Sequence, residues 1–292
     1  MRDALVSVGM SVYNSSETVE TAVQSIIKQS YTNWELIIID DGSTDNTLNV
    51  LEKFTDKRIK VHSDGLNKGL AVRLNELVHL SSGEYFARMD ADDISYPDRI
   101  EKQLIFLCEH DYVDLVSTRV LIVSDDLRCM GTYPYHVDHD EICSRPYSGF
   151  YMPHPTWMGK KKWFLDNLYN EKSFMSEDQE LLLRTYASST FHCIDEILLG
   201  YRVPRITLKK EYKTRLSRVM DYARIFKRKK QYFLIFKVFV IQSVKLLYSV
   251  IAIMSPYTYM LLKNRALPVD QGECDRWCSI KQIICSNDGA SR

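Results

Sequence analysis

The chain has 292 residues and a mass of 34.1 kDa, with 45% hydrophobic and 26% charged residues. These values fit one large domain with or without an appendage, and they exclude a disordered, collagen-like or disulfide-stapled chain. Lys and Arg together number 38, as do Asp and Glu, but the charge is distributed unevenly. Between Arg205 and Arg265 there are 15 basic residues and two acidic ones, so the rest of the chain is acidic. An acidic body with a basic tail predicts that the tail contacts an anionic surface.

The seven cysteines are odd in number and scattered, and no two of them have C-x-x-C spacing. This pattern favours reduced thiols over a metal site. Residues 1–5 carry one Arg and one Asp and lead directly into an apolar segment, without the architecture of a signal peptide. The sequence therefore predicts a cytosolic body.

Short apolar segments alternate with helical patterns along the first half of the chain. Residues 6–12 are rich in Val and Met, and residues 35–40 contain an unbroken Leu-Ile-Ile-Ile run, which is typical of a strand in a parallel sheet covered on both faces. Further strands are expected near residues 59–62, 84–89, 114–123 and 194–203. Amphipathic helices are expected between these strands, at residues 19–27, 48–54, 70–78 and 95–107. The alternation predicts an α/β domain with a mainly parallel, mixed sheet flanked by helices, whose ligands bind beyond the carboxyl ends of the strands.

Acidic residues follow two of these strands. Asp41 lies in the turn after the strand at residues 35–40, and Asp90-Ala91-Asp92 follows the strand at residues 84–89. Side chains two residues apart in an extended segment lie on the same side, so Asp90 and Asp92 can face one site. Two close carboxylates favour a hard divalent cation, Mg²⁺ or Mn²⁺. A solvated acidic loop is the alternative for this short motif.

Five segments give the chain a more specific resemblance. They are residues 11–14 (SVYN), 29–31 (QSY), 38–45 (IIDDGSTD), 83–95 (GEYFARMDADDIS) and 177–178 (ED). In this order they resemble the inverting glycosyltransferases of family 2, which have the Rossmann-like GT-A fold, and the resemblance covers residues 5–203. Five motifs in order are far more specific than any one of them. The resemblance implies a catalytic domain over residues 1–205 that takes a sugar from a nucleotide-diphosphate donor, a UDP-sugar.

On the donor side, the resemblance assigns roles to residues at the ends of strands. Ser11 and Tyr13 would meet the nucleotide, with Tyr13 stacked on the base, and Asp41 would accept a hydrogen bond from the imide of uracil. Asp90 would hold the ribose or the water shell of the metal, and Asp92 would ligate the metal that bridges both phosphates. The alternatives are a tyrosine at the edge of the core for Tyr13 and a turn-forming role for Asp41.

Four arginines are candidates for contacts in this site. Arg73 and Arg88 are candidates to pair with the phosphates or with the acidic cluster, and a surface ion pair is the alternative for each. Many family members continue Tyr-Arg-x-His after the last strand, whereas residues 201–204 read Tyr-Arg-Val-Pro. The contact from that His is therefore missing, and Arg202 or Arg205 is expected to replace it.

Asp178 carries the proton chemistry that the resemblance implies. Inversion requires an acceptor hydroxyl to attack the anomeric carbon opposite the leaving diphosphate, and one carboxylate takes its proton. Glu177 is expected to orient neighbouring groups, and His154 and Asp93 are placed on the acceptor side. A charged first helical turn is the alternative for Glu177 and Asp178, and a structural loop role is the alternative for His154.

Residues 206–265 combine basic residues with a long apolar stretch. In a helix, Lys237, Gln242, Lys245 and Ser249 fall within an arc of about 140°, with bulky apolar residues on the other side. This pattern predicts a helical tail that lies in the interface of an anionic membrane.

Two alternatives for the tail are a packed accessory helix and a helix that spans the membrane at residues 246–262, which are short for a span and contain a proline. Nucleic acid is not expected as a partner, because the tail is too rich in apolar bulk. Residues 266–292 are expected to form a polar, frayed tail.

Together these features predict a cytoplasmic enzyme, peripheral on the inner face of the cell membrane, that adds one sugar to a lipid-linked saccharide acceptor. The bacterial setting, in O-antigen, capsule or exopolysaccharide assembly, rests on the resemblance. A processive synthase is not expected, because the Gln-x-x-Arg-Trp signature and multiple membrane spans are missing. A nucleotidyltransferase is one alternative, but the loop at residues 14–17 lacks the Lys or Arg that it would need. A non-catalytic membrane-bound binding module is another, and Asp92 and Asp178 argue against it.

Overall fold

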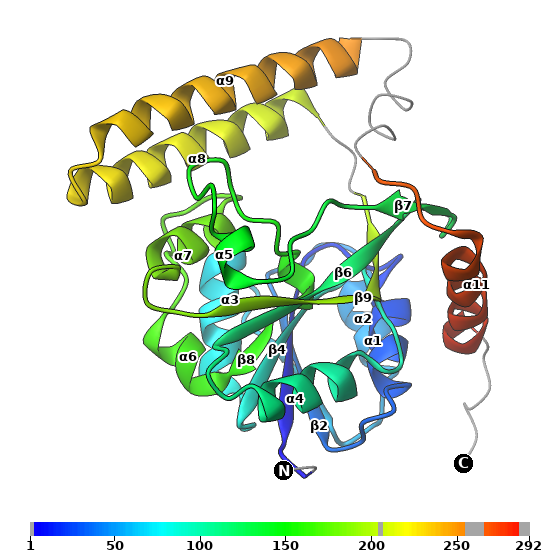
Figure 1. Ribbon diagram of the computed structural model, residues 1–292. Coiled ribbons are helices and arrows are strands. Elements are labelled where there is room, and N and C mark those ends of the chain that lie inside the picture. The colour runs from blue at the N-terminus through cyan, green and yellow to red at the C-terminus, as the bar shows by residue number, and fades with distance from the viewer. Residues whose placement is uncertain (1–2, 204–206, 255–265, 286–292) are drawn as a thin grey trace.

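The computed structural model describes residues 3–203, 207–254 and 266–285. A nine-stranded sheet has the order β3-β2-β1-β4-β8-β6-β9-β5, with β7 paired to β6, and helices cover both of its faces (Figure 1). The strands are β1 (Val6–Val12), β2 (Trp34–Asp40), β3 (Ile59–Ser63), β4 (Tyr85–Asp90), β5 (Ile94–Ser95), β6 (Leu115–Val123), β7 (Cys129–Thr132), β8 (Met158–Lys160) and β9 (Phe191–Arg202). The helices are α1 (Val19–Ile27), α2 (Thr47–Leu51), α3 (Leu70–Leu80), α4 (Arg99–Glu109), α5 (His139–Ile142), the 3₁₀ turn η1 (His154–Thr156), α6 (Lys161–Asp166), α7 (Glu177–Thr185), α8 (Leu208–Arg228), α9 (Tyr232–Met254) and α11 (Gln271–Cys285).

The strands β3, β2, β1 and β4 are all parallel, so their carboxyl ends meet at one edge. In this register Val12 pairs with Asp40, and Ser11 pairs with Asp90. Every residue of β2 is buried, which confirms the prediction of a strand covered on both faces. The register therefore brings the predicted donor-side segments next to one another.

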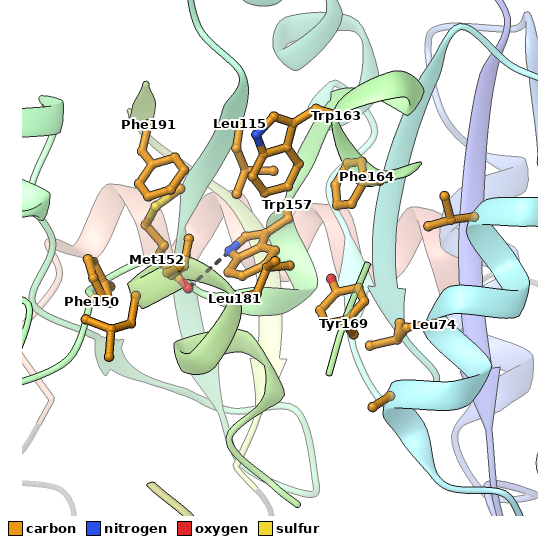
Figure 2. Close-up of a cluster of buried hydrophobic side chains, with 14 of the residues drawn as sticks. Leu74, Leu115, Phe150, Met152, Trp157, Trp163, Phe164, Tyr169, Leu181 and Phe191 are labelled. Atoms are coloured by element: carbon orange, nitrogen blue, oxygen red, sulfur yellow. Dashed lines mark hydrogen bonds between the residues drawn. The ribbon is translucent and has the colours of Figure 1, made fainter. Parts of the chain in front are cut away.

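Alternate side chains of β2 enter two hydrophobic cores. Leu36 packs with residues of α1, α2 and α4, whereas Ile37 packs with residues of α3, α6 and α7 on the opposite face. Figure 2 shows the second core around Trp157, whose Nε1 donates to the backbone oxygen of Met152 (3.2 Å). This core holds η1 and α7 against the sheet and so positions the segments that later form one side of the site.

The remaining half of the sheet is mixed. β6 and β9 are parallel, β8 is antiparallel to both β4 and β6, and β5 is antiparallel to β9. β6 and β7 form an antiparallel pair across the turn that contains Asp125. The predicted mixed α/β sheet is therefore confirmed, with an uninterrupted parallel block confined to the first four strands.

The long helices α8 and α9 form a hairpin joined at residues 229–231 and lie side by side along one side of the body (Figure 1). α8 is anchored by Tyr222 and Phe226, which are fully buried in the core that includes α7. The residues of the predicted polar arc meet the protein: Gln242 and Ser249 are buried. A helical period identifies two faces without showing which one meets the protein.

The prediction of a frayed C-terminal tail is wrong for residues 271–285, which form α11. Trp277 is fully buried and stacks on Tyr96, with ring centroids 5.9 Å apart. Its indole also covers Gly200, where an added Cβ would lie 2.4 Å from the ring. Few apolar residues anchor this helix, and the residues they contact are distant in the sequence. The polar composition of the segment therefore gave no indication that it packs on the body.

The expectation of seven reduced cysteines is also wrong for one pair. Cys129 in β7 and Cys274 in α11 form a disulfide, with Cα atoms 5.8 Å apart. The two are separated by 145 residues, so their spacing carries no signal. With the antiparallel bridge between Thr132 and Leu267, the disulfide attaches the C-terminal segment to β7.

Candidate active site

The loops that follow β1 and β2 are hydrogen-bonded to each other. The Asn14 N–H donates to Ser43 Oγ (2.9 Å), and the Thr44 N–H donates to Asn14 Oδ1 (2.8 Å). Asn14 has a φ of 50°, in the left-handed region that asparagine tolerates better than most residues. Tyr13 is 50% exposed beside this junction, and Ser11 lies between β2 and β4. Nucleotide binding by Ser11 and Tyr13 stays a prediction.

Asp41, in the turn after β2, has a carboxylate surrounded by donors. It accepts the backbone N–H groups of Lys68 (2.7 Å) and Gly69 (3.0 Å) and the Nε–H of Arg73 (2.8 Å). The Arg73 side chain is 1% exposed, and it also pairs with Asp64 at 2.6 Å. The surface ion pair considered for Arg73 is therefore wrong, because this arginine is a buried cation that fixes the Asp41 carboxylate. Contact between Asp41 and a base stays a prediction.

Asp90, Asp92 and Asp93 come together after β4, with one ligand oxygen from each lying within 4.8 Å of the others. Arg88 is buried and donates through both terminal nitrogens to the Asp90 carboxylate, with Nη1 2.7 Å from Oδ2. The surface ion pair considered for Arg88 is therefore also wrong. The Arg88 guanidinium is therefore the counter-charge of Asp90, and it makes no direct hydrogen bond to Asp92 or Asp93.

Burial and mutual repulsion favour the protonated forms of two of these carboxyls. Burial, followed by the charge of Asp90, raises the pKa of Asp92 to about 6. Burial raises the pKa of Asp93 well above its usual range. One Asp93 oxygen accepts the N–H of Arg202 (3.0 Å), and the other has no hydrogen-bond partner in the part of the chain that the structure describes. Clustered oxygens that lack counter-charge are the donor set that a hard divalent cation requires.

A cavity of about 470 Å³ joins the end of β4 to the start of α7. Arg88 and Asp90 line it together with Glu177 and Asp178, and His154 contributes to the same lining. A cavity of this size falls within the range of small-ligand sites, which is about 300–1,000 Å³. The side chain at position 178 thus faces the same space as the side chain at position 90.

The other predicted donor-side residues do not line this cavity. Residues at the ends of β1 and β2 and on α3 form a separate group: Ser11, Tyr13, Asp41 and Arg73. Asp92 and Asp93 also lie outside the lining, next to Asp90. The structure therefore brings the predicted residues together as two groups that meet at Asp90.

Glu177 and Asp178 occupy the first turn of α7 and differ in environment. Glu177 is 7% exposed, and burial, followed by the charge of Asp178, raises its pKa to about 7. Asp178 is partly exposed and accepts one hydrogen bond, from Nε2 of Gln179 (3.1 Å). The residue before them, Ser176, is tied to α8 by its Oγ–H bond to Asp221 (2.7 Å). The pair forms the acidic first turn of α7, as the alternative predicted, and both members also line the cavity.

His154 combines a position in the cavity lining with packing in the core. Its Nε2 lies 2.9 Å from the hydroxyl of Tyr169, and its ring meets the edge of Trp157. Burial, and then the nearby charge of Arg88, lowers the pKa of His154 well below its usual range. The histidine is therefore neutral at neutral pH. It lines the cavity and also packs against the core residues behind it.

The lining residues that were not found from the sequence include two on α8. Lys210 and Thr214 reach the cavity from α8, far from every motif. The basic composition of the tail was the one signal in this direction. Arg202, expected to replace the missing histidine, has its Nη1 bonded to the backbone oxygen of Asp125 (2.9 Å), and Arg205 lies outside the described residues.

The model of the family described as Glycosyl transferase family 2 matches residues 7–168. Among curated proteins, the Putative glycosyltransferase EpsE of Bacillus subtilis is 42% identical over 123 residues, which are 41% of this chain and 44% of EpsE. The O-antigen biosynthesis glycosyltransferase WbnJ of Escherichia coli is 30% identical over 207 residues, or 68% of this chain and 80% of WbnJ. WfgD of Escherichia coli, a UDP-Glc:alpha-D-GlcNAc-diphosphoundecaprenol beta-1,3-glucosyltransferase, is 37% identical over 49% of this chain. The chain spans about half the length of EpsE and of WfgD, at 44% and 56%.

Solved structures share the fold at low sequence identity. TarS of S. aureus, residues 1–349 in complex with UDP-GlcNAc, superposes with a TM-score of 0.63 and 16% identity over 96% of this chain and 81% of TarS. The mannosyltransferase PcManGT of Pyrobaculum calidifontis, in complex with GDP-Man and Mn²⁺, gives a TM-score of 0.60 and 14% identity over 96% and 84% of the two chains. These similarities establish the architecture of the sheet and its helices.

Proposed function

This chain belongs to glycosyl transferase family 2, and we propose that it transfers one sugar from a UDP-sugar to a hydroxyl of a lipid-linked saccharide, with inversion at the anomeric carbon. The observation that carries this proposal is the cavity lined by both Asp90 and Asp178. It has Asp90, from the acidic cluster after β4, and a partly exposed carboxylate on α7 around one space. A donor and an acceptor can meet there.

A nucleotide-diphosphate donor is supported by the group at the ends of β1 and β2. Tyr13 exposes an aromatic ring on which a base can stack, and the buried Arg73 fixes the Asp41 carboxylate in the turn after β2. The solved TarS and PcManGT structures hold UDP-GlcNAc and GDP-Man, which belong to this class of donor. We assign UDP because a carboxylate near the base suits the imide N–H of uracil.

Asp90, Asp92 and Asp93 would hold the cofactor, Mg²⁺ or Mn²⁺. Their clustered oxygens fit a hard cation, and Arg88 keeps the Asp90 carboxylate oriented. When bound, a divalent cation offsets the negative charge that grows on a leaving diphosphate. PcManGT provides independent support, because its structure contains Mn²⁺.

Asp178 acts as the general base. Its carboxylate takes the proton of the acceptor hydroxyl while the oxygen bonds to the anomeric carbon, and the bond to the diphosphate breaks on the opposite face. Glu177 is buried and holds its proton up to about pH 7, so it orients the turn rather than competing as the base. A single displacement needs no covalent nucleophile, and so no cysteine takes part.

A lipid-linked acceptor is supported by the relatives' names, since WfgD acts on a diphosphoundecaprenol-linked sugar and WbnJ serves O-antigen biosynthesis. We therefore place this chain in bacterial surface-polysaccharide assembly, as a cytoplasmic protein peripheral on the inner face of the cell membrane. His154 and Glu177, which both line the cavity, would lie toward the acceptor, whereas Asp93 lies outside the lining. The basic tail would meet the anionic membrane surface.

A donor panel tests the proposal. Purified protein is incubated with UDP-Glc, UDP-Gal, UDP-GlcNAc or UDP-GalNAc, with Mn²⁺ or with EDTA, and UDP release is measured. We expect release from one donor with Mn²⁺, loss of release in EDTA, and inverted anomeric configuration in the product by NMR. A nucleotidyltransferase would instead release pyrophosphate from UTP and a sugar phosphate. A binding module would bind a donor without releasing UDP, and either result would contradict the proposal.

A further inference from the structure

One side of α9 exposes apolar side chains at a spacing of three or four residues. Phe233 is 68% exposed and Phe236 is 64% exposed. At 100° per residue these positions form a single stripe along the helix. We call this stripe the α9 face, and it consists of Phe233, Phe236, Val240, Val244, Leu247 and Ile251. Bulky apolar groups in one exposed stripe indicate an interaction surface.

The opposite side of α9 is occupied by the protein itself. Nη1 of Arg215 donates to Oε1 of Gln242 (3.3 Å), and the Ser249 hydroxyl donates to Oε2 of Glu211 (3.1 Å). The Lys245 ammonium donates to a backbone oxygen of the body (3.0 Å). These contacts fix the rotation of α9, so that its polar side faces α8 and the body and the α9 face points outward.

The hairpin that carries the α9 face is strongly basic. α8 carries eight Lys and Arg residues and two acidic residues, and the turn that leads into α9 adds Lys229 and Lys230. Lys209, Lys213 and Lys227 are exposed. A hairpin that combines an exposed apolar stripe with exposed cations complements a surface whose interior is hydrocarbon and whose headgroups are anionic.

A membrane-spanning α9 is disfavoured by its contacts. Residues Tyr232–Ile251 are long and apolar enough to cross a bilayer by length and composition alone. Crossing would either bring the charges of α8 into the hydrocarbon or break the hydrogen bonds that α8 makes to Gln242 and Ser249. Both outcomes are costly, whereas a helix that lies in the interface retains the hairpin.

We infer that the α8–α9 hairpin docks flat on an anionic lipid bilayer, with the α9 face in the acyl-chain boundary and the lysines of the hairpin among the headgroup phosphates. This inference rests on the proposed function for its purpose, which is access to a lipid-linked acceptor. α8 supplies Lys210 and Thr214 to the lining of the catalytic cavity, so the docked hairpin places that cavity beside the membrane. The acceptor then reaches Asp178 without leaving the bilayer.

Vesicle co-sedimentation of the full chain tests the inference. Wild type is compared with Phe236→Ser, Leu247→Ser and the double variant on vesicles of phosphatidylcholine alone and of phosphatidylcholine mixed with phosphatidylglycerol. The matched control is Tyr112→Ser, which replaces an aromatic residue of similar exposure (66%) on the body. We expect binding to the mixed vesicles, release by high salt, and an affinity loss of about tenfold for each apolar side chain removed. The Tyr112→Ser protein should bind as wild type does.

Three outcomes would overturn the inference. Equal vesicle binding by the double variant would show that another surface docks. Retention of the protein in vesicles after alkaline carbonate extraction would indicate a spanning helix. A wild-type dimer in light scattering that Phe236→Ser and Leu247→Ser convert to a monomer, without vesicle binding by either form, would assign the α9 face to a second copy of the chain. An assay of UDP release with a water-soluble acceptor does not require a bilayer. It therefore separates failure of membrane docking from failure of the proposed function.

Discussion

Asp90 and Glu177 line the same cavity, but the protein holds their carboxyl groups in opposite ways. On the donor side, the buried guanidinium of Arg88 clamps Asp90, and Arg73 holds Asp41 in the same manner. On the acceptor side, no ion pair involves Glu177 or Asp178 within residues 3–203, 207–254 and 266–285. Burial dominates there, and it raises the pKa of Glu177 to about 7.

This difference in environment suits two different functions, ligand binding and proton transfer. A carboxylate fixed by a buried arginine stays charged and oriented, which suits the binding of a cation or a polar donor. A carboxylate without a cationic partner is free to take up a proton, which suits a base. In the proposed function, the same residue type serves binding near the ends of β2 and β4 and proton transfer at the start of α7.

The largest effect on stability is expected from Arg73→Met, which breaks the donor-side clamp. Removing the guanidinium leaves the buried Asp41 carboxylate without its cation, and such a change costs about 3–5 kcal/mol. Urea unfolding measures the loss. The control Lys162→Met removes an exposed ion pair with Asp166 and should change the free energy of unfolding by less than about 1 kcal/mol. Equal losses of unfolding free energy in the two variants would contradict a stabilising role for the buried Arg73–Asp41 ion pair.

A smaller effect is expected from Asp92→Asn, which weakens the acidic cluster without touching α7. Transfer should fall by about 100-fold at low Mn²⁺, since one anionic oxygen ligand is lost. High Mn²⁺ should recover part of the rate. Initial rates across a Mn²⁺ titration check this, and a variant with the metal dependence of wild type would remove Asp92 from the cation site.

The smallest effect is expected from Glu177→Gln and depends on pH. Glu177 binds its proton more tightly in the folded chain, where its pKa is about 7, than in the unfolded chain. Between the unfolded pKa and about pH 7 the folded state therefore holds more protons, so stability falls as pH rises through this window and the loss is complete above it. Glutamine removes this contribution. The variant should gain about 1–2 kcal/mol over wild type between about pH 5 and pH 8, measured by urea unfolding at each pH.

A stability difference that stays constant across that range would show that Glu177 is not protonated by its burial. Asp178 lies next to Glu177 in the first turn of α7, so this pH series bears on the environment of both residues. A constant difference would also weaken the distinction between the donor and acceptor sides.

The first half of the fold was predictable because its signals are local. β2 contains an unbroken apolar run, and the acidic residues at the ends of β2 and β4 lie at strand ends that a parallel sheet must bring together. The same reasoning reached Asp90 and Asp92 as candidates, whereas Asp178 came from the family resemblance. That Asp90 and Asp178 line one cavity depends on the fold and could be expected only through that resemblance.

Features that depend on distant partners were not predictable. Arg73 is buried because Asp41 and Asp64 lie on other elements, and the sequence shows no sign of this pairing. Trp277 packs on Gly200 and Tyr96 across the chain, which turned an apparently frayed tail into a docked helix. Periodicity found both sides of α9 but could not tell which side would meet α8.

The most direct test of the central claim measures donor binding and sugar transfer separately in Asp178→Asn. The account predicts that transfer falls by about 10²–10⁴-fold, because the variant loses the base that activates the acceptor. UDP affinity with Mn²⁺, measured by calorimetry, should stay within about twofold, because the donor is held by a different group of residues. Transfer at the wild-type rate, or a loss of UDP affinity in parallel with transfer, would contradict the account.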